Sequence, residues 1–182
     1  MSRIPTPATI NDAPEASRPL LERVSKQLGS VPNMFRLEAQ SAAALEGHLG
    51  LSGALAKGRL PAATRERIAL AIAEYNGCGY CLSAHSYIAA NLAKLSPEEI
   101  AANRSGRSTD AKADAAVAFA LKVAQLRGRV GDADFAAVRE AGYDDGQIVE
   151  IVQHIALNVY TNYLNEVART EIDFPVATDV AA

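Results

Sequence analysis

The chain of 182 residues is long enough for one domain with its own hydrophobic core, so it needs neither a disulfide nor a metal to fold. Apolar residues make up 49%, aromatic residues only 5%, and the formal net charge is −3, with acidic and basic residues interspersed. This composition favours close-packed helices and excludes a basic nucleic-acid-binding surface or a polybasic membrane patch. We therefore expect neither a nucleic acid nor a membrane as a partner.

Prolines in residues 1–15 predict an extended N-terminal arm, which precedes a single domain over residues 16–182. Caps, glycines and prolines divide the domain into helices. The predicted helices cover about 18–28, a short segment after Val31-Pro-Asn, 41–57, 61–76, 78–94, a short segment from Ser96, 110–127, 132–141 and 145–168. No segment alternates like a strand, so the predicted fold class is all-α.

The N-terminal residues lack a basic-then-apolar signal sequence, and the longest apolar run, 68–73, is too short to span a bilayer. We therefore expect a soluble, cytoplasmic protein. In a reducing cytosol, a lone Cys-x-x-Cys is typical of a catalytic or metal-binding pair rather than a structural disulfide.

The only two cysteines, Cys78 and Cys81, form such a pair, and His85 follows four residues later. On a helix that starts near Cys78, the three side chains share one inward-facing strip. The pattern predicts a redox dithiol with a histidine that moves protons. Two alternatives stay open: buried cysteines that act as small apolar residues, and a metal site completed by His154 or Glu66.

Electrostatics at a helix start favour Cys78 as the more acidic thiol, because unpaired backbone N–H groups stabilise an anion there. The deeper position of Cys81 and its nearness to His85 favour Cys81 instead. The same helical pattern places Tyr80 and Ser83, with other polar residues, on the outer face and Leu92 on the inner face.

Glu66 lies on a predicted helix that is apolar nearly all round, so we expect a buried carboxylate that needs a partner or a raised pKa. It suits a proton acceptor that works on a thiol through His85, although a structural pair with Arg65 or Arg67 is also possible. Glu74, four residues before Cys78, either supports the site or lies on the surface.

The last predicted helix carries a polar stripe beside its apolar face: His154, Asn158, Asn162 and Asn165. Buried asparagines usually hydrogen-bond across a packing seam, either within one chain or between subunits. The alternative is that the stripe forms part of the active-site wall.

The order Glu66, Cys78-Gly-Tyr-Cys81, His85 resembles the Glu-x11-Cys-x2-Cys-x3-His signature of the alkylhydroperoxidase AhpD-like proteins. These belong to the carboxymuconolactone decarboxylase-like superfamily. The segment Val31-Pro-Asn-Met-Phe35 and the asparagine-rich final helix are similar to its peroxidase-related branch. The best-known members carry a histidine between the cysteines, where this chain has Tyr80.

The resemblance implies an AhpD-like helical bundle that assembles into trimers or hexamers and uses no cofactor or metal. It implies an antioxidant thiol-dependent reductase whose partners are a small hydroperoxide and a thiol or dithiol reductant protein. Cys81 would attack the peroxide, Cys78 would resolve the product as a disulfide, and His85 with Glu66 would relay protons.

Three other functions are weighed against the peroxidase. The pair could reduce the disulfide of a partner peroxiredoxin. Cys78, Cys81 and His85 could instead bind a metal. A non-redox enzyme of the superfamily could use Glu66 and His85 as acid and base on a lactone.

Overall fold

The computed structural model describes residues 2–177, which form helices and no strand, so the predicted all-α class is confirmed. The N-terminal arm, predicted to be extended, contains two short 3-10 turns at Ile10–Asp12 and Glu15–Ser17. The α-helices are α1 (Arg18–Leu28), α2 (Asn33–Glu38), α3 (Ala42–Leu55), α4 (Ala62–Asn76), α5 (Gly79–Asn91), α6 (Pro97–Arg104), α7 (Ala111–Gln125), α8 (Asp132–Glu140) and α9 (Asp145–Ala168).

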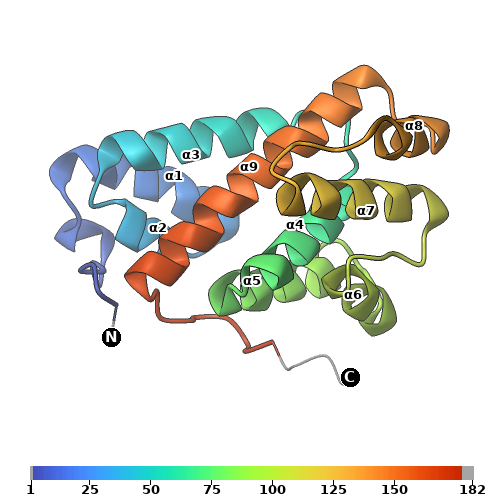
Figure 1. The fold of residues 1–182 in the computed structure, drawn as a ribbon. Coiled ribbons are helices and arrows are strands. Elements are labelled where there is room, and N and C mark those ends of the chain that lie inside the picture. Colours follow the sequence, from blue (N-terminus) through green and yellow to red (C-terminus); the bar gives the residue numbers. More distant parts are fainter. Residues whose placement is uncertain (1, 178–182) are drawn as a thin grey trace.

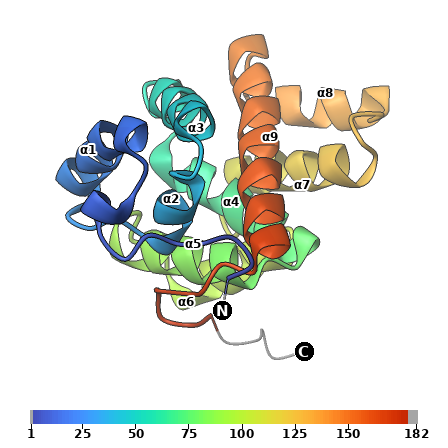
Figure 2. The ribbon, with the colours of Figure 1, turned by 90° about the vertical axis from the view of Figure 1, so that its left-hand side faces the viewer.

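Helix α4 lies at the centre of the molecule. Residues 68–73 are all buried, because α5, α6, α7 and α9 pack around this helix. A helix surrounded in this way can be apolar on every side, which explains its sequence. The long helix α9 runs between the group α1 to α3 and the pair α7 and α8 (Figures 1 and 2).

The turn between α4 and α5 positions the two cysteines. Gly77 has a φ of +68°, a left-handed conformation that glycine adopts without steric cost, and it ends α4. The backbone N–H of Cys78 then donates to the carbonyl of Ala73 at 3.0 Å, and Cys78 itself caps α5. Because α5 starts at once and packs against α4, Glu66 on α4 lies opposite His85 on α5.

The expected outer face of α5 is wrong at two positions. Tyr80 is only 4% exposed and Ser83 only 1%, whereas Leu92, expected inside, follows the end of the helix and is 71% exposed. The cause is residues 170–177, here called the C-terminal strap, which run along α5 after α9 ends (Figure 1). A helical pattern identifies the residues that share a face, but it does not reveal a distant segment that covers that face.

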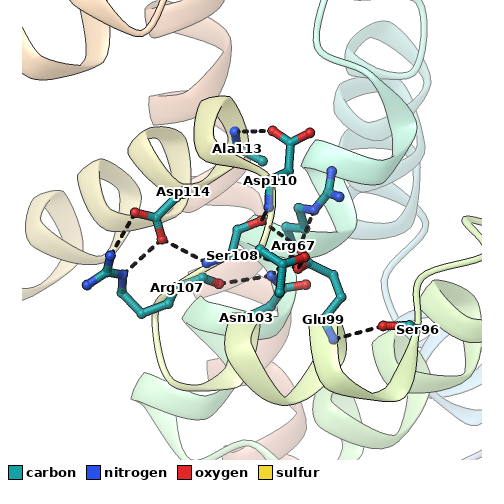
Figure 3. A network of polar contacts seen from close by, with 10 residues as sticks. Arg67, Ser96, Glu99, Asn103, Arg107, Ser108, Asp110, Ala113 and Asp114 are labelled. Carbon is teal, nitrogen blue, oxygen red and sulfur yellow. Dashed lines mark hydrogen bonds and ion pairs between the residues drawn. The ribbon is translucent and has the colours of Figure 1, made fainter.

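A buried carboxylate joins α4 to the loop between α6 and α7 (Figure 3). Glu99, 3% exposed, accepts hydrogen bonds from Arg67 Nε at 2.6 Å and Asn103 Nδ2 at 2.9 Å. It also accepts bonds from the Ser108 hydroxyl at 2.6 Å and the Thr109 backbone N–H at 2.7 Å. Because Arg67 is adjacent to Glu66, this network fixes the segment of α4 that carries Glu66 relative to α6.

We expect Glu99→Gln to lower the free energy of unfolding at pH 7 by about 3 kcal/mol. Burial alone raises the pKa of Glu99, but bonds from Ser108, Thr109 and Asn103 outweigh it and lower the pKa from 4.5 to about 2. The contribution of a carboxylate with a lowered pKa is complete above its unfolded pKa and is lost as the pH falls towards its folded pKa. Urea unfolding should therefore show the difference between variant and wild type shrinking between pH 4.5 and pH 2. A constant difference across this range would contradict the ionic role of Glu99.

Candidate active site

Both cysteines lie at the start of α5 and are reduced. Cys78 is fully buried and Cys81 is 3% exposed, so the expected inward strip is confirmed. Their side chains approach to 3.2 Å, and the Sγ of Cys78 accepts a hydrogen bond from the backbone N–H of Cys81 at 3.4 Å. Two thiols one helical turn apart at this separation can form a disulfide after modest side-chain rotation.

The two thiols differ in acidity, and the order is the reverse of the one expected from the helix start. The largest effect on Cys81 is a hydrogen bond from Cys78, which lowers its pKa. Burial raises the pKa, but the charge of His85 and hydrogen bonds from Asn162 and Asn165 lower it further, to about 6. The hydrogen bond to Cys81, together with burial, raises the pKa of Cys78 well above its usual range. The helix start, which favoured Cys78, is therefore outweighed by the groups around Cys81, and His85 is one of them.

His85 and Glu66 form a hydrogen-bonded pair beside Cys81. The Nδ1 of His85 lies 2.8 Å from Glu66 Oε2, and both side chains are partly buried. Burial lowers the pKa of His85, but the charge and hydrogen bond of Glu66 outweigh it and, with Cys81, raise the pKa above its ordinary value. A histidine with a raised pKa beside a thiol with a lowered pKa is a common arrangement for activating a cysteine.

Arg65 and Arg67, the alternative partners of Glu66, bind elsewhere. Arg65 Nη1 donates to the carbonyl of Leu55 at 3.0 Å, while Arg67 binds Glu99. The carboxylate of Glu66 is therefore left for His85.

Helix α9 brings asparagines against the cysteines from the opposite side. Asn165 Nδ2 donates to Cys81 Sγ at 3.3 Å, and Asn162 also lowers the pKa of Cys81. Asn158, one turn earlier, bonds the carbonyl of His154 at 2.8 Å instead. Part of the predicted stripe therefore forms the wall of the site, and part of it bonds within the helix.

The C-terminal strap covers the cysteine pair. The Tyr80 hydroxyl donates to Asp173 Oδ1 at 2.9 Å, and the Phe174 ring meets the Tyr80 ring edge-on with centroids 5.9 Å apart. The backbone N–H of Ala177 donates to the Ser83 hydroxyl at 3.1 Å. Because Cys81 is only 3% exposed and the strap packs in the same apolar cluster, we expect movement of the strap to increase access to its sulfur.

We expect Phe174→Ala to accelerate alkylation of Cys81 by iodoacetamide roughly fivefold, because an aromatic pair contributes about 1 kcal/mol to holding the strap. Mass spectrometry of quenched samples measures the rate. Phe135→Ala is the matched control, since Phe135 makes a similar edge contact with Phe119 on α7, which does not carry the cysteines. Equal rates in wild type and Phe174→Ala would show that the strap does not limit access.

Glu74 and His154, the other candidate residues, make no hydrogen bond to either cysteine among those found in residues 2–177. Glu74 binds Arg104 at 2.5 Å. His154 is buried on α9, and burial, then the charge of Arg65, lower its pKa to about 4. Within residues 2–177, no group of three or more His, Cys, Asp or Glu side chains is placed to hold a metal ion.

Sequence reasoning missed two residues that shape the site. Asn76 Nδ2 donates to Asn162 Oδ1 at 2.8 Å and orients that amide. Asp173 accepts from Tyr80 and from the backbone N–H of Asn33 at 2.8 Å, so it ties the strap to α2 and α5. In the sequence, Asn76 is visible only as a polar residue before Gly77, and Asp173 only as an acidic residue near the C-terminus. Neither has a spacing that indicates its partner.

The sequence and the fold are both similar to those of known proteins. Residues 40–126, which include α4, the cysteine pair and His85, match the carboxymuconolactone decarboxylase family. This stretch of the chain is therefore similar to that family, and the chain as a whole has an AhpD-like fold. A solved AhpD core from Ralstonia eutropha JMP134, an uncharacterized peroxidase-related protein, superposes with a TM-score of 0.84. The two share 27% identity, over 94% of this chain and 92% of that chain.

Two further structures share the AhpD-like fold at lower identity. A peroxidase-related protein from Silicibacter sp. TM1040 has a TM-score of 0.81 and 22% identity, over 93% of this chain and 91% of that chain. The debrominase Bmp8 has a TM-score of 0.77 and 23% identity, over 92% and 91%. No curated protein matches the sequence. No helix in residues 2–177 is both long and apolar enough to cross a membrane.

Proposed function

We propose that this AhpD-like protein reduces hydroperoxides with Cys81 as the attacking thiol and Cys78 as the resolving thiol. The observation that carries the proposal is the position of Cys81. Its thiol has a pKa near 6, it lies beside the His85–Glu66 pair, and the second thiol is 3.2 Å away. A thiolate that is populated at neutral pH, with an acid and a resolving thiol in reach, meets the needs of peroxide reduction.

The reaction balances in two steps. The Cys81 thiolate attacks the terminal peroxide oxygen, the O–O bond breaks, and the alkoxide that leaves takes a proton from His85. The product is a Cys81 sulfenic acid and an alcohol. The Cys78 thiol then attacks the Cys81 sulfur, and a disulfide and water form. An external dithiol returns the disulfide to two thiols and is itself oxidised.

A thiol count tests the proposal directly. Reduced protein should lose both free thiols on addition of one equivalent of an organic hydroperoxide, and dithiothreitol should restore them. The same protein alkylated beforehand serves as the control. Two thiols that survive the peroxide would contradict the proposal and would favour the non-redox, lactone-directed alternative.

Reductive debromination is a second candidate. A Cys→Ala variant of Bmp8 has been solved in complex with 2,3,4-tribromopyrrole. Here the rings of Tyr80 and Phe174 pack in the same cluster as the cysteines and could stack a planar ring. Cys81 would take the bromine from carbon, the ring would gain a proton, and Cys78 would expel bromide as the disulfide forms. Bromide release without oxidation by hydroperoxide would favour this candidate.

The expected homo-oligomer stays a prediction, and α9 offers a surface that suits it. Five large apolar side chains at helical spacing are exposed along one side of this helix: Val149, Val152, Tyr160, Tyr163 and Val167. A long unpartnered apolar stripe is typical of a helix that packs against another subunit.

A further inference from the structure

Two buried side-chain amides face the sulfur of Cys81 from α9. Asn165 is 2% exposed, and its Nδ2 bridges Cys81 Sγ at 3.3 Å and the carbonyl of Thr161 at 2.9 Å. Asn162 is fully buried, and its Nδ2 has no hydrogen-bond partner among residues 2–177. A buried amide donor without a partner destabilises the fold, so its presence in a native protein calls for a functional explanation such as ligand binding.

The orientation of Asn162 is set from outside the cysteine pair. Its Oδ1 accepts from Asn76 Nδ2 at 2.8 Å, so the amide cannot turn over without losing that bond. The free Nδ2 is thereby held towards Cys81, and it contributes to the low pKa of that thiol. Asn158 and Asn165 each donate to the helix carbonyl four residues earlier, but only Asn165 also donates to a cysteine sulfur.

We propose that the amides of Asn162 and Asn165 form a donor pair for the reacting sulfur: Asn165 holds the thiolate, and Asn162 binds the oxygen that Cys81 receives. The pair assigns the attacking role to Cys81 although Cys78 occupies the helix start. Donors fixed before the reaction stabilise developing negative charge without reorganisation, as they do in an oxyanion hole. The second role rests on the proposed peroxide reduction, whereas the first concerns the thiolate alone.

The charged groups around the two sulfurs agree with this assignment. The imidazolium of His85 favours an anion on Cys81, whereas the carboxylate of Glu166 on α9 disfavours one on Cys78. Two thiols this close do not ionise independently, so a donor that acts on Cys81 alone favours the charge on that thiol.

The test measures which cysteine reacts and at what pH. Iodoacetamide alkylation of the reduced protein between pH 4 and pH 10, followed by peptide mass mapping, gives the midpoint and the site of reaction. Wild type should react first at Cys81, with a midpoint near 6. Asn165→Leu and Asn162→Leu should each raise that midpoint by roughly one pH unit and increase the share of label on Cys78.

Two controls separate a thiolate-binding role from a structural one. Asn158→Leu removes a buried amide from the same face of α9 without touching a cysteine and should leave the midpoint unchanged. Asn165→Asp keeps the shape of the side chain but replaces the donor with an anion, so it should raise the midpoint further and remains informative if the leucine variants fold poorly. An unchanged midpoint and unchanged cysteine preference in Asn165→Asp and Asn162→Leu would overturn the donor pair.

The outcomes also distinguish this proposal from the proposed function. A midpoint that shifts as expected in a protein that does not consume hydroperoxide would support thiolate binding by Asn165 and reject the peroxidase. Normal peroxide consumption in variants whose midpoint does not shift would support the peroxidase and reject thiolate binding by Asn165. The role of Asn162 in oxygen binding is tested at a pH well above the midpoint, where Cys81 is fully ionised in every variant. There we expect Asn162→Leu to form the sulfenic acid roughly tenfold more slowly than wild type.

Discussion

Replacement of Cys81 by serine is expected to reduce hydroperoxide turnover by roughly a thousandfold or more, because a serine hydroxyl does not ionise at neutral pH and accepts oxygen poorly. Replacement of Cys78 by serine should also stop turnover, but at a later step. Cys81 should still be oxidised once, to a sulfenic acid that no thiol in the protein can resolve. Steady-state peroxide consumption and trapping of sulfenic acid by dimedone measure the two steps separately.

The two cysteine variants control for one another, since each removes one buried sulfur from the same turn of α5. Dimedone should label Cys78→Ser after one equivalent of hydroperoxide and should not label Cys81→Ser. The reverse labelling would exchange the roles of the two cysteines. Full turnover in both variants would show that neither thiol is needed and would contradict thiol chemistry in this protein.

The second large effect is expected at Glu66. The rate of peroxide reduction should rise with pH as Cys81 ionises, with a midpoint near 6. It should fall again once His85 loses the proton that the leaving alkoxide needs, and this happens above the ordinary pKa of histidine because Glu66 outweighs the effect of burial. The profile is therefore bell-shaped, with its maximum between the two midpoints.

Glu66→Gln should reduce the maximal rate roughly a hundredfold and move the descending limb to lower pH. Without the carboxylate, burial dominates and lowers the pKa of His85, so little imidazolium remains where Cys81 is ionised. Stopped-flow measurement of hydroperoxide reduction from pH 5 to pH 9 gives both limbs. Glu74→Gln is the matched control, because Glu74 lies on the same helix but binds Arg104. A descending limb that stays in place in Glu66→Gln would contradict the relay.

Local signals in the sequence were sufficient for most of the helix boundaries. Gly29 and Gly77 end helices in the left-handed conformation, Ser96 and Asp144 cap helix starts, and Pro61 precedes the first turn of α4. These signals act over a few residues, so each can be interpreted without knowledge of the fold. The same is true of the inward strip of Cys78, Cys81 and His85, which follows from helical periodicity alone.

The chemistry of the site depends on contacts between distant parts of the chain. The sequence left Glu66 with three possible partners, and only the packing of α4 against α5 shows that the partner is His85. Tyr80 seemed to belong to the outer face because nothing near it in sequence indicates the strap that covers it.

The acidity of the two thiols is the property for which the sequence and the tertiary structure differ most. From the sequence alone, the start of the helix favoured Cys78 as the more acidic thiol, whereas the nearness of His85 favoured Cys81. In the folded chain, Asn162 and Asn165 reach Cys81 from a helix more than eighty residues away in sequence. The pKa of a buried group sums the effects of all surrounding charges and dipoles, whatever their distance along the chain. The sequence therefore identified the dithiol and the helix that carries it, whereas only the tertiary structure shows the asparagines that lower the pKa of one of its two sulfurs.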